Sequence, residues 1–431
     1  MSRLLQLLPV STGERVLEII PALRAALAGS GPALLPVPAD DGAATGRLAT
    51  SFDAGTELAC WEDSPDDPTA LVITTSGSTG RPKGALLPAA ALAASADSTR
   101  RRLTNRRFGH GPPPPPGNWL LALPATHIAG LQVLLRALSE GTEPTVLDTA
   151  QSFTAERFVA AVDRMPAGPR FTSLVPTQLA RIMAVPDAAG ALATFDAVLV
   201  GGASTPAALL DDVEVAGIHA LTTYGMSETC GGCVYDGVPL DGVTVTGSQS
   251  ADGSAATRPG RLSITGPVVA RGYRGRPNHP AFQQAPGGRF QTFQTDDLGV
   301  WDAQGWRIVG RVDDVITTGG IKIDPAVVET VLQRVTGVAE VIVTGVPDPG
   351  WGESLVAVVV QAPDGPPDLR AMRAAVGTEL GAAAAPRHLV LTDRFPLRGP
   401  GKPDRAAIRE LAMAEVTARL LAEIAGPPVT W

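Results

Sequence analysis

The feature that most constrains this chain is a loop of small polar residues that directly follows an apolar run. Residues 70–73 read Ala-Leu-Val-Ile, and residues 74–84 read Thr-Thr-Ser-Gly-Ser-Thr-Gly-Arg-Pro-Lys-Gly. Glycines let backbone N–H groups approach anionic oxygens, the hydroxyls add donors, and Lys83 adds positive charge. It is not a Walker A loop, which needs Ser or Thr directly after its Lys, because Gly84 stands there. The pattern predicts a polyphosphate site, with a flexible linker as the alternative.

Length and composition limit the number of domains and the classes of partner that this chain can have. A chain of 431 residues predicts two or three domains, and 44% hydrophobic with 18% charged residues allows a sizeable core. The net charge of −8 disfavours a dedicated partner of nucleic acid or of anionic membranes, although a local basic pocket for phosphates remains compatible with it. The apolar start is brief and is broken at Pro9, so we expect no signal peptide, no integral membrane contact and a cytoplasmic location.

The chain has three cysteines, Cys60, Cys230 and Cys233. An odd and sparse set argues against a disulfide framework and for a reducing compartment. Cys230 and Cys233 have the spacing of a zinc or redox pair, but no second Cys pair or His pair accompanies them. We therefore expect no metal or redox role for this pair.

Alternating strand and helix patterns occupy residues 70–225, after one helical pattern in residues 1–60. Leu131, Leu134, Leu135 and Leu138 share one helical face, and a second helix should begin at Pro176, whose fixed φ suits a first turn. Strands are expected at residues 119–123, 171–175, 197–200 and 218–222. This alternation predicts a parallel sheet covered by helices.

The pattern changes in the last half of the chain. Short β runs with glycine punctuation in residues 233–310 suggest a small barrel or an antiparallel sheet. A compact α+β unit follows Arg311. Its helices are expected at 325–335, at 368–380 and from about 404, and its strands at 338–345, 354–361 and 388–392.

Residues 75–84 resemble the phosphate loop of the adenylate-forming superfamily, which comprises acyl-CoA synthetases, peptide-synthetase adenylation domains and luciferases. Ten ordered positions make this resemblance much stronger than composition alone. It implies a site for ATP, with Thr79 also near Mg²⁺. The residues it assigns to ATP are Thr75, Ser76, Gly77, Ser78, Thr79, Gly80 and Lys83.

Residues 222–229 read Thr-Thr-Tyr-Gly-Met-Ser-Glu-Thr and resemble the second signature of that superfamily. The resemblance implies that Tyr224 packs on adenine beside Gly225, that Thr229 contacts the α-phosphate, and that Glu228 helps to hold Mg²⁺. A hard carboxylate oxygen suits magnesium. The alternative for Glu228 is an acid placed at a helix N-terminus, where the dipole favours it.

Three later elements match the same superfamily in order. Residues 295–299 resemble its Thr-Gly-Asp element, although Asp296 replaces the glycine; Asp297 would then bind ribose, with an ordinary Asp-rich turn as the alternative. Residues 310–323 resemble the segment that joins the two domains. This resemblance places Arg311 on ribose, Asp313 at the hinge and Lys322 among the cofactor-binding residues.

Residues 400–405 read Pro-Gly-Lys-Pro-Asp-Arg and resemble the closing Gly-Lys element of the superfamily. There, the lysine stabilises the pentavalent transition state at the α-phosphate, which is a suitable task for a flexible ammonium beside glycine. Lys402 takes this position. A solvated surface lysine would be the ordinary alternative.

The short large domain and residues 123–132 most resemble the o-succinylbenzoate–CoA ligases of menaquinone biosynthesis. The resemblance implies that His127 lines the acyl pocket. A second, unreacted carboxylate needs a cationic or donor-rich partner, for which His127, Gln132 and Arg136 are candidates. Arg136 as a surface charge of its helix is the alternative. Glycine after a strand lets ligands approach the backbone, as expected for Gly201, Gly202 and Ala203.

The expected fold is α/β: a large N-terminal domain of helix-covered β-sheets plus a small β-barrel (residues 1–311), then a small mobile α+β domain (312–431). The expected activity is AMP-forming ligation of a small-molecule acid to CoA, with ATP, Mg²⁺ and CoA required. Another aryl or fatty acid, a carrier-protein acceptor, and a non-catalytic nucleotide-binding regulator are the alternatives. Homo-oligomerisation is left open.

Overall fold

The computed structural model describes residues 3–75, 82–108, 115–148, 150–247, 259–285, 287–363, 365–398 and 402–425. Contacts divide the chain into two units. The first comprises Met1–Thr246, Leu262–Thr295 and Asp302–Trp306, and the second comprises Gly247–Arg261, Asp296–Trp301 and Arg307–Trp431. The predicted domain boundary after Arg311 stays a prediction. Within the described residues, no helix is both long and apolar enough to cross a membrane.

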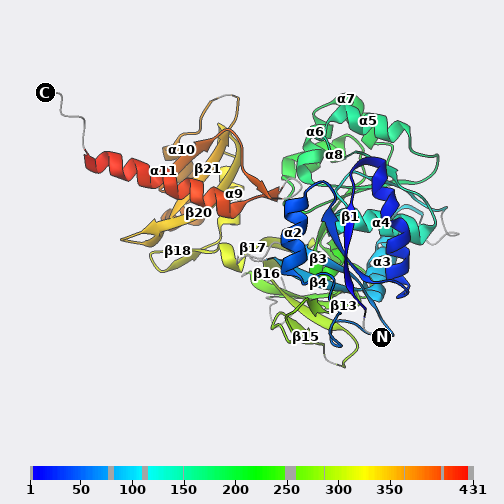
Figure 1. The fold of residues 1–431 in the computed structure, drawn as a ribbon. Helices are drawn as coiled ribbons and strands as arrows, with labels where there is room; N and C mark the ends of the chain where they lie inside the picture. Colours follow the sequence, from blue (N-terminus) through cyan, green and yellow to red (C-terminus); the bar gives the residue numbers. More distant parts are fainter. Residues whose placement is uncertain are drawn as a thin grey trace. The chain divides into compact units, whose positions relative to one another are not determined.

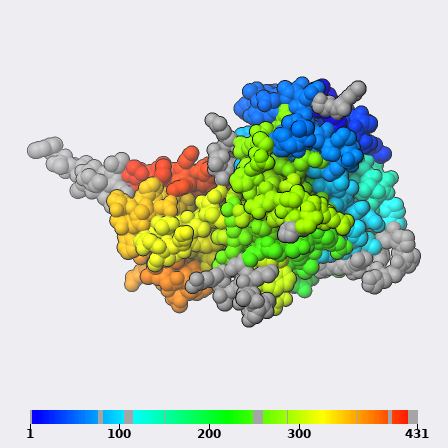
Figure 2. All heavy atoms as spheres, turned by 90° about the horizontal axis from the view of Figure 1, so that it is seen from below, coloured from blue at the N-terminus to red at the C-terminus, as the bar shows by residue number. Residues whose placement is uncertain are grey.

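The first sheet has the strand order β1-β2-β3-β4-β14. Strands β1, β2 and β3 run parallel, while β4 and β14 run antiparallel to their neighbours. The strand bounds are Leu5–Val10 for β1, Ala33–Pro38 for β2, Thr69–Thr75 for β3, Lys83–Pro88 for β4 and Gly272–Tyr273 for β14. Figure 2 shows green atoms of the middle of the chain beside blue atoms of the N-terminal segments on the surface. Both residues of β14, which pairs with β4, are buried.

The N-terminal segment contains more than the single helix that was predicted. The helical pattern is confirmed by η1 (Gly13–Ile19) and α1 (Ile20–Leu27), but β1, β2 and α2 (Gly42–Ser51) were not predicted. Pro9 lies in β1, and β2 contains two prolines, a residue type that argues against a strand. Burial overrides this local preference, because Leu5, Leu35 and Val37 are completely buried.

The second sheet has the order β11-β10-β9-β8-β7-β5-β6 and lies among the helices in Figure 1. Its strands are Val238–Pro239, Gly231–Tyr235, Ala220–Met226, Ala197–Gly201, Arg170–Leu174, Asn118–Leu121 and Thr145–Val146, in that order. The five strands from β9 to β6 are parallel, as the alternating pattern predicts, and β10 and β11 add an antiparallel edge.

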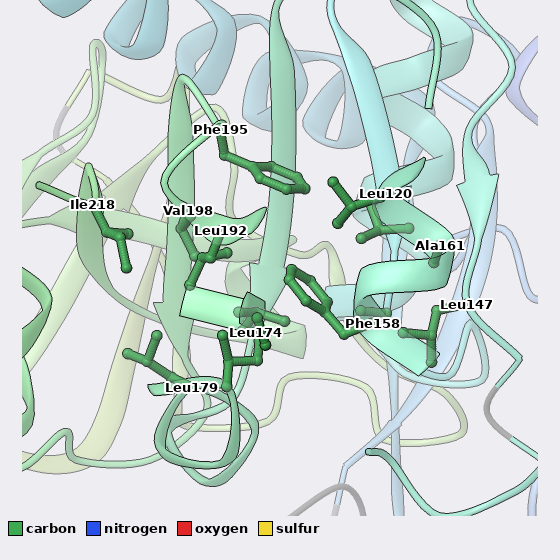
Figure 3. Close-up of a cluster of buried hydrophobic side chains, with 14 of the residues drawn as sticks. Leu120, Leu147, Phe158, Ala161, Leu174, Leu179, Leu192, Phe195, Val198 and Ile218 are labelled. Carbon is green, nitrogen blue, oxygen red and sulfur yellow. The ribbon is translucent and has the colours of Figure 1, made fainter. Parts of the chain in front are cut away.

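Helices of this region pack on the second sheet. Their bounds are Ala89–Phe108 for α3, Ile128–Glu140 for α4, Ala155–Asp163 for α5, Pro176–Met183 for α6, Pro186–Leu192 for α7 and Ala207–Val215 for α8. Figure 3 shows one buried cluster, in which Phe158 of α5 stacks on Phe195 at 6.1 Å between ring centroids. Helix α4 contains the four leucines of the predicted helical face, and α6 begins at Pro176 as the sequence predicts.

A third sheet has the order β12-β13-β16-β15, with β17 paired to β16. The bounds are Thr244–Thr246 for β12, Gly260–Gly266 for β13, Phe282–Gln284 for β15, Gln291–Asp302 for β16 and Gly305–Arg311 for β17. Pairing is antiparallel between β12 and β13 and between β15 and β16. The glycine-punctuated β segment is thus an antiparallel sheet.

The second unit holds a mixed sheet of order β19-β18-β21-β20, with β22 parallel to β21. Helices α9 and α10 share one apolar cluster with the sheet, and α11 packs in another. All six predicted helices and strands occur. The bounds are Val312–Asp314 (η3), Ile316–Thr318 (β18), Ile321–Ile323 (β19), Pro325–Leu332 (α9), Val338–Asp348 (β20), Gly352–Gln361 (β21), Leu369–Leu380 (α10), Ala382–Ala384 (η4), His388–Thr392 (β22), Leu397–Arg398 (β23), Lys402–Pro403 (β24) and Arg405–Ala425 (α11).

One ion pair fixes the start of α11 inside this unit. The guanidinium of Arg405 donates to both carboxylate oxygens of Glu329, each at 2.9 Å, and lies 3.5 Å from Asp314. Burial raises the pKa of Glu329, while the charge of Arg405 opposes that shift. The charge of Arg405 therefore lowers the free-energy penalty of keeping the Glu329 carboxylate ionised.

We expect Arg405→Met to destabilise the second unit by about 2–3 kcal/mol, because a mostly buried carboxylate loses its cation. Arg334→Met is the matched control, since Arg334 pairs with Glu379 on the surface and such pairs contribute about 0–1 kcal/mol. Urea unfolding of both variants measures the difference. Equal losses in the two variants would contradict the prediction.

Candidate functional site

The predicted polyphosphate loop lies in the sequence between two antiparallel strands. Thr75, the last residue of β3, pairs with Lys83, the first residue of β4. A strand that returns antiparallel after the loop differs from a Walker A motif, in which a helix follows. Gly84 is required by packing, because a Cβ there would lie 2.7 Å from Val72. The predicted residues Ser76, Gly77, Ser78, Thr79 and Gly80 lie outside the described residues.

Glu228 lies in a short turn, η2 (Ser227–Thr229), that joins β9 to β10. Its residue is 6% exposed, and its Oε1 accepts a hydrogen bond of 2.6 Å from the hydroxyl of Tyr273. The Nζ of Lys83 lies 5.2 Å from the ring centroid of the same tyrosine. The structure therefore brings Lys83 and Glu228, predicted from two separate motifs, to one side chain that the sequence did not single out.

Thr229 closes the same turn with its side chain. The residue is completely buried, its Oγ1 accepts from the Met226 amide at 2.9 Å, and it donates to the Gly231 carbonyl at 2.8 Å. The predicted contact of Thr229 with a phosphate stays a prediction. Ser227, on the other side of Glu228, is half-buried and offers a second hydroxyl at this turn.

Several predicted residues follow the carboxyl ends of neighbouring parallel strands. His127 follows β5, Gly201 ends β8, and Glu228 follows β9. Carboxyl ends of parallel strands meet at one edge of a sheet, where ligands bind in open α/β folds. Gly202 has φ +84°, which L side chains rarely adopt, and it is exposed together with Ala203. The parallel sheet thus brings these residues to one edge.

Two glycines permit close approach of neighbouring strands near that edge: Gly201 of β8 to β9, and Gly225 of β9 to β10. A Cβ on Gly201 would lie 2.3 Å from the Thr223 hydroxyl, and a Cβ on Gly225 would lie 2.0 Å from the Gly231 carbonyl oxygen. Larger side chains at either position would displace β9. Tyr224, between these contacts on β9, is half-buried. The predicted adenine contact of Tyr224 remains a prediction.

Helix α4 and its N-cap carry three of the six residues predicted for the acyl acid. His127 is half-buried at its N-cap, and burial lowers the pKa of His127, so the imidazole is neutral at pH 7. Gln132 is 1% exposed; its Nε2 donates to the Cys230 carbonyl at 2.7 Å. The Gln132 Oε1 is buried without a partner among the described residues. Gln132 therefore supports the turn that carries Glu228.

Arg136 lies two helical turns beyond His127 and is only 4% exposed, so the surface-charge alternative is wrong. It donates to the Tyr235 hydroxyl at 3.3 Å, and its guanidinium lies 5.2 Å from the Trp119 ring centroid. Its Nε is buried without a partner in the described part of the chain. No carboxylate among the described residues pairs with it. Arg136 is a buried cation held by aromatic side chains.

The residues predicted to bind ribose and the predicted hinge belong to the second unit. Arg311 donates to Asp297 at 2.8 Å, and it also lies 3.8 Å from Asp313. Asp296, the residue that departs from the family pattern, accepts from Arg261 at 2.7 Å. Asp297 and Arg311 are therefore adjacent, as a shared ligand would require.

Two predicted lysines lie on strands of the second unit. Lys322 is exposed on β19, in the hairpin that β18 and β19 form through Gly319 and Gly320. Lys402 begins β24, which pairs with β23. The side chain of Lys402 lies outside the described residues.

The two closely spaced cysteines are buried next to the η2 turn, with Cys230 at its C-cap and Cys233 in β10. Cys230 and Cys233 are completely buried, whereas Cys60 is exposed. Burial raises the pKa of the Cys233 thiol to about 12 and also raises the pKa of Cys230. No group of three or more potential metal ligands occurs among the described residues. Protonated, inaccessible thiols are poor metal ligands and poor nucleophiles.

Comparison with known proteins places this geometry in context. The AMP-binding enzyme model matches residues 37–274, and the AMP-binding enzyme C-terminal domain matches residues 327–402. A probable 2-succinylbenzoate–CoA ligase of Mycobacterium tuberculosis is 41% identical over 406 residues, covering 93% of this chain and 97% of that protein. A feruloyl-CoA synthase of Amycolatopsis is 33% identical, covering 90% and 81%.

Two solved structures share the fold. ATP-bound MatB of Rhodopseudomonas palustris has a TM-score of 0.76 at 21% identity, covering 95% of this chain and 89% of that chain. The o-succinylbenzoate CoA synthetase of Bacillus subtilis with its acyl-adenylate has a TM-score of 0.70 at 22% identity, covering 94% and 88%. Both match the α/β architecture of a large N-terminal and a smaller C-terminal domain.

We expect one thiol per folded chain to react with a thiol reagent at pH 8, and three after denaturation. Exposed Cys60 should react fast, since thiolate character and access control reactivity. A colorimetric thiol titration measures both numbers, and the Cys60→Ser variant should abolish the fast reaction. Stoichiometric zinc in the purified protein, or two or more fast thiols, would contradict this prediction.

Proposed function

Since the chain belongs to the AMP-binding enzyme family, we propose that it is an AMP-forming acid–CoA ligase and that its acid is 2-succinylbenzoate. The observation that carries the chemistry is the convergence of Lys83 and Glu228, from separate motifs, on Tyr273. The identity of 41% over nearly the whole chain to a probable 2-succinylbenzoate–CoA ligase supports the choice of acid.

In the proposed first step, the carboxylate of the acid attacks the α-phosphorus of ATP, and pyrophosphate leaves. Lys83 and the loop before it hold the outer phosphates. Thr229, whose hydroxyl also closes the turn, would contact the α-phosphate, and Ser227 offers a further hydroxyl beside Glu228. Asp297 and Arg311, which contact one another, are positioned to share the ribose hydroxyls.

Glu228 is the described residue that would hold magnesium, and its chemistry fits. Magnesium in nucleotide sites takes one or two carboxylates together with substrate phosphates, so a single buried carboxylate suffices. The ion, when bound, neutralises charge on the phosphates. Thr79, the other predicted ligand, lies outside the described residues.

In the proposed second step, the thiol of CoA attacks the acyl-adenylate and AMP leaves. The domain that follows Arg311 would rotate about Asp313 between the two steps, which removes Lys402 from the α-phosphate. A hinge needs one or a few residues that absorb a backbone change. Asp313 is exposed in η3, so rotation there breaks little packing.

The choice of a dicarboxylic acid is supported by Arg136. A buried guanidinium is normally paired with a carboxylate, and leaving it unpaired is costly. Within the described residues Arg136 has only aromatic and hydroxyl contacts. We propose that its positive potential favours an acid with a second carboxylate, while neutral His127 lines the pocket at the sheet edge. A feruloyl-CoA synthase among the relatives favours another aryl acid as the second candidate.

We expect Lys402→Ala to lower the rate of acyl-adenylate formation by about 10²–10³, or ~3–4 kcal/mol, because one positive charge is lost at the first transition state. Thioester formation from preformed acyl-AMP should change little. Pyrophosphate release and thioester formation are measured separately, with Arg370→Ala as the control, because Arg370 is an exposed cation of α10 in the same unit. Equal impairment of both half-reactions by Lys402→Ala would contradict its assignment.

A pyrophosphate-release screen over several acids tests the substrate. We expect kcat/KM for 2-succinylbenzoate to exceed that for benzoate and ferulate by at least about tenfold, a difference of ~1.4 kcal/mol. Arg136→Met should reduce this preference, and Arg136→Lys, which keeps the charge, should retain most of it. Faster turnover of benzoate, ferulate or a fatty acid would refute the substrate but not the adenylation chemistry. No pyrophosphate release with any acid would favour a non-catalytic nucleotide-binding protein.

A further inference from the structure

Tyr273 joins three segments that are far apart in the sequence. The residue is 2% exposed and pairs with Ala85 of β4, two residues beyond Lys83. Its hydroxyl donates to the Glu228 Oε1 at 2.6 Å, and its ring lies 5.2 Å from the Lys83 Nζ. One buried side chain thus touches both the end of the phosphate loop and the predicted magnesium carboxylate.

The backbone holds Tyr273 rigidly on both sides. The amide of Arg271 donates to the Leu86 carbonyl at 2.9 Å, and the amide of Arg274 donates to the Gly84 carbonyl at 2.8 Å. The amide of Ala270 donates to the Glu228 carbonyl at 2.8 Å. The segment that carries Tyr273 is therefore fixed to β4 and to the η2 turn at the same time.

Aromatic packing fixes the ring as well. His279 and Phe282 meet Tyr273 edge-on, with centroid distances of 4.8 and 5.0 Å and interplanar angles of 84° and 80°. Edge-to-face pairs of this kind are favourable and restrict ring rotation. The hydroxyl is consequently presented at a fixed point, where it donates to one carboxylate oxygen.

We propose that Tyr273 is a positioning residue that orients the Glu228 carboxylate for a divalent cation and sets the place of that cation relative to Lys83. The proposal rests on the proposed function. A carboxylate has two oxygens, so one can accept from a tyrosine while the other ligates a cation. Partners that orient a metal ligand in this way typically contribute 10- to 100-fold to metal affinity.

Tyr273→Phe tests this role because it removes the hydroxyl and keeps the ring that packs on His279, Phe282 and Lys83. We expect the Mg²⁺ concentration for half-maximal ATP binding, measured by calorimetry, to rise about 10- to 100-fold. ATP binding in the presence of EDTA should stay within about twofold of the parent. A purely structural role of the hydroxyl would instead weaken both equally.

Tyr235→Phe is the matched control. Tyr235 is also fully buried, and its hydroxyl contacts Thr99 and Arg136 rather than Glu228. Loss of the Tyr235 hydroxyl should leave the Mg²⁺ dependence of ATP binding unchanged. A shift in Tyr273→Phe no larger than that in Tyr235→Phe would overturn the proposal.

Glu228→Gln completes a double-mutant cycle. In that background Tyr273→Phe should cause no further change in Mg²⁺ dependence, and an undiminished effect would overturn the proposal. Should thermal unfolding show that Tyr273→Phe does not fold, Glu228→Asp replaces it. This variant withdraws the carboxylate from the hydroxyl by one methylene, and it should weaken Mg²⁺ to the same extent. A parent protein that binds no MgATP would refute the proposed function itself, which is a distinguishable result.

Discussion

The close approach of β9 and β10 is the constraint on which the candidate site depends. A Cβ on Gly225 would lie 2.0 Å from the carbonyl oxygen of Gly231, so the hairpin closes only with glycine at Gly225. Cys230 takes a left-handed conformation in the turn, and its carbonyl accepts from both Ser95 and Gln132. Backbone strain in the turn is thus compensated by helices α3 and α4. The result is a rigid turn that presents Glu228.

Buried polar groups around this turn divide into two kinds. Some serve the structure, such as the Thr229 hydroxyl, whose bonds close the turn. Others contact a predicted functional residue, as the hydroxyl of Tyr273 donates to Glu228. A buried polar atom without a hydrogen bond destabilises the fold. The partner of each buried polar side chain therefore indicates whether the side chain stabilises the turn or orients another residue. The buried guanidinium of Arg136 differs from both kinds, because its Nε has no hydrogen-bond partner among the described residues.

The two units divide the proposed chemistry. The first unit contains the predicted phosphate loop, Glu228 and the residues predicted for the acyl pocket, and the second contains the pair of Asp297 and Arg311 together with Lys402. Its ion pair between Arg405 and Glu329 lies three residues beyond Lys402, so α11 begins at a fixed point. In the proposed mechanism, adenylation needs the positive charge of Lys402 at the α-phosphate, whereas thioester formation does not. A lysine on a separate unit can meet both requirements.

The sequence by itself determined the elements and motifs whose signals are local. Alternation of strands and helices predicted the parallel sheet, Pro176 marked a helix start, and ordered motifs indicated Lys83, Glu228 and Lys402. Only the tertiary structure decided what depends on contacts between distant segments. Burial makes strands of the proline-containing β1 and β2 and places Arg136 inside rather than on the surface. Tyr273 meets Glu228 across 45 residues of sequence because β14 pairs with β4, and no local pattern encodes that pairing.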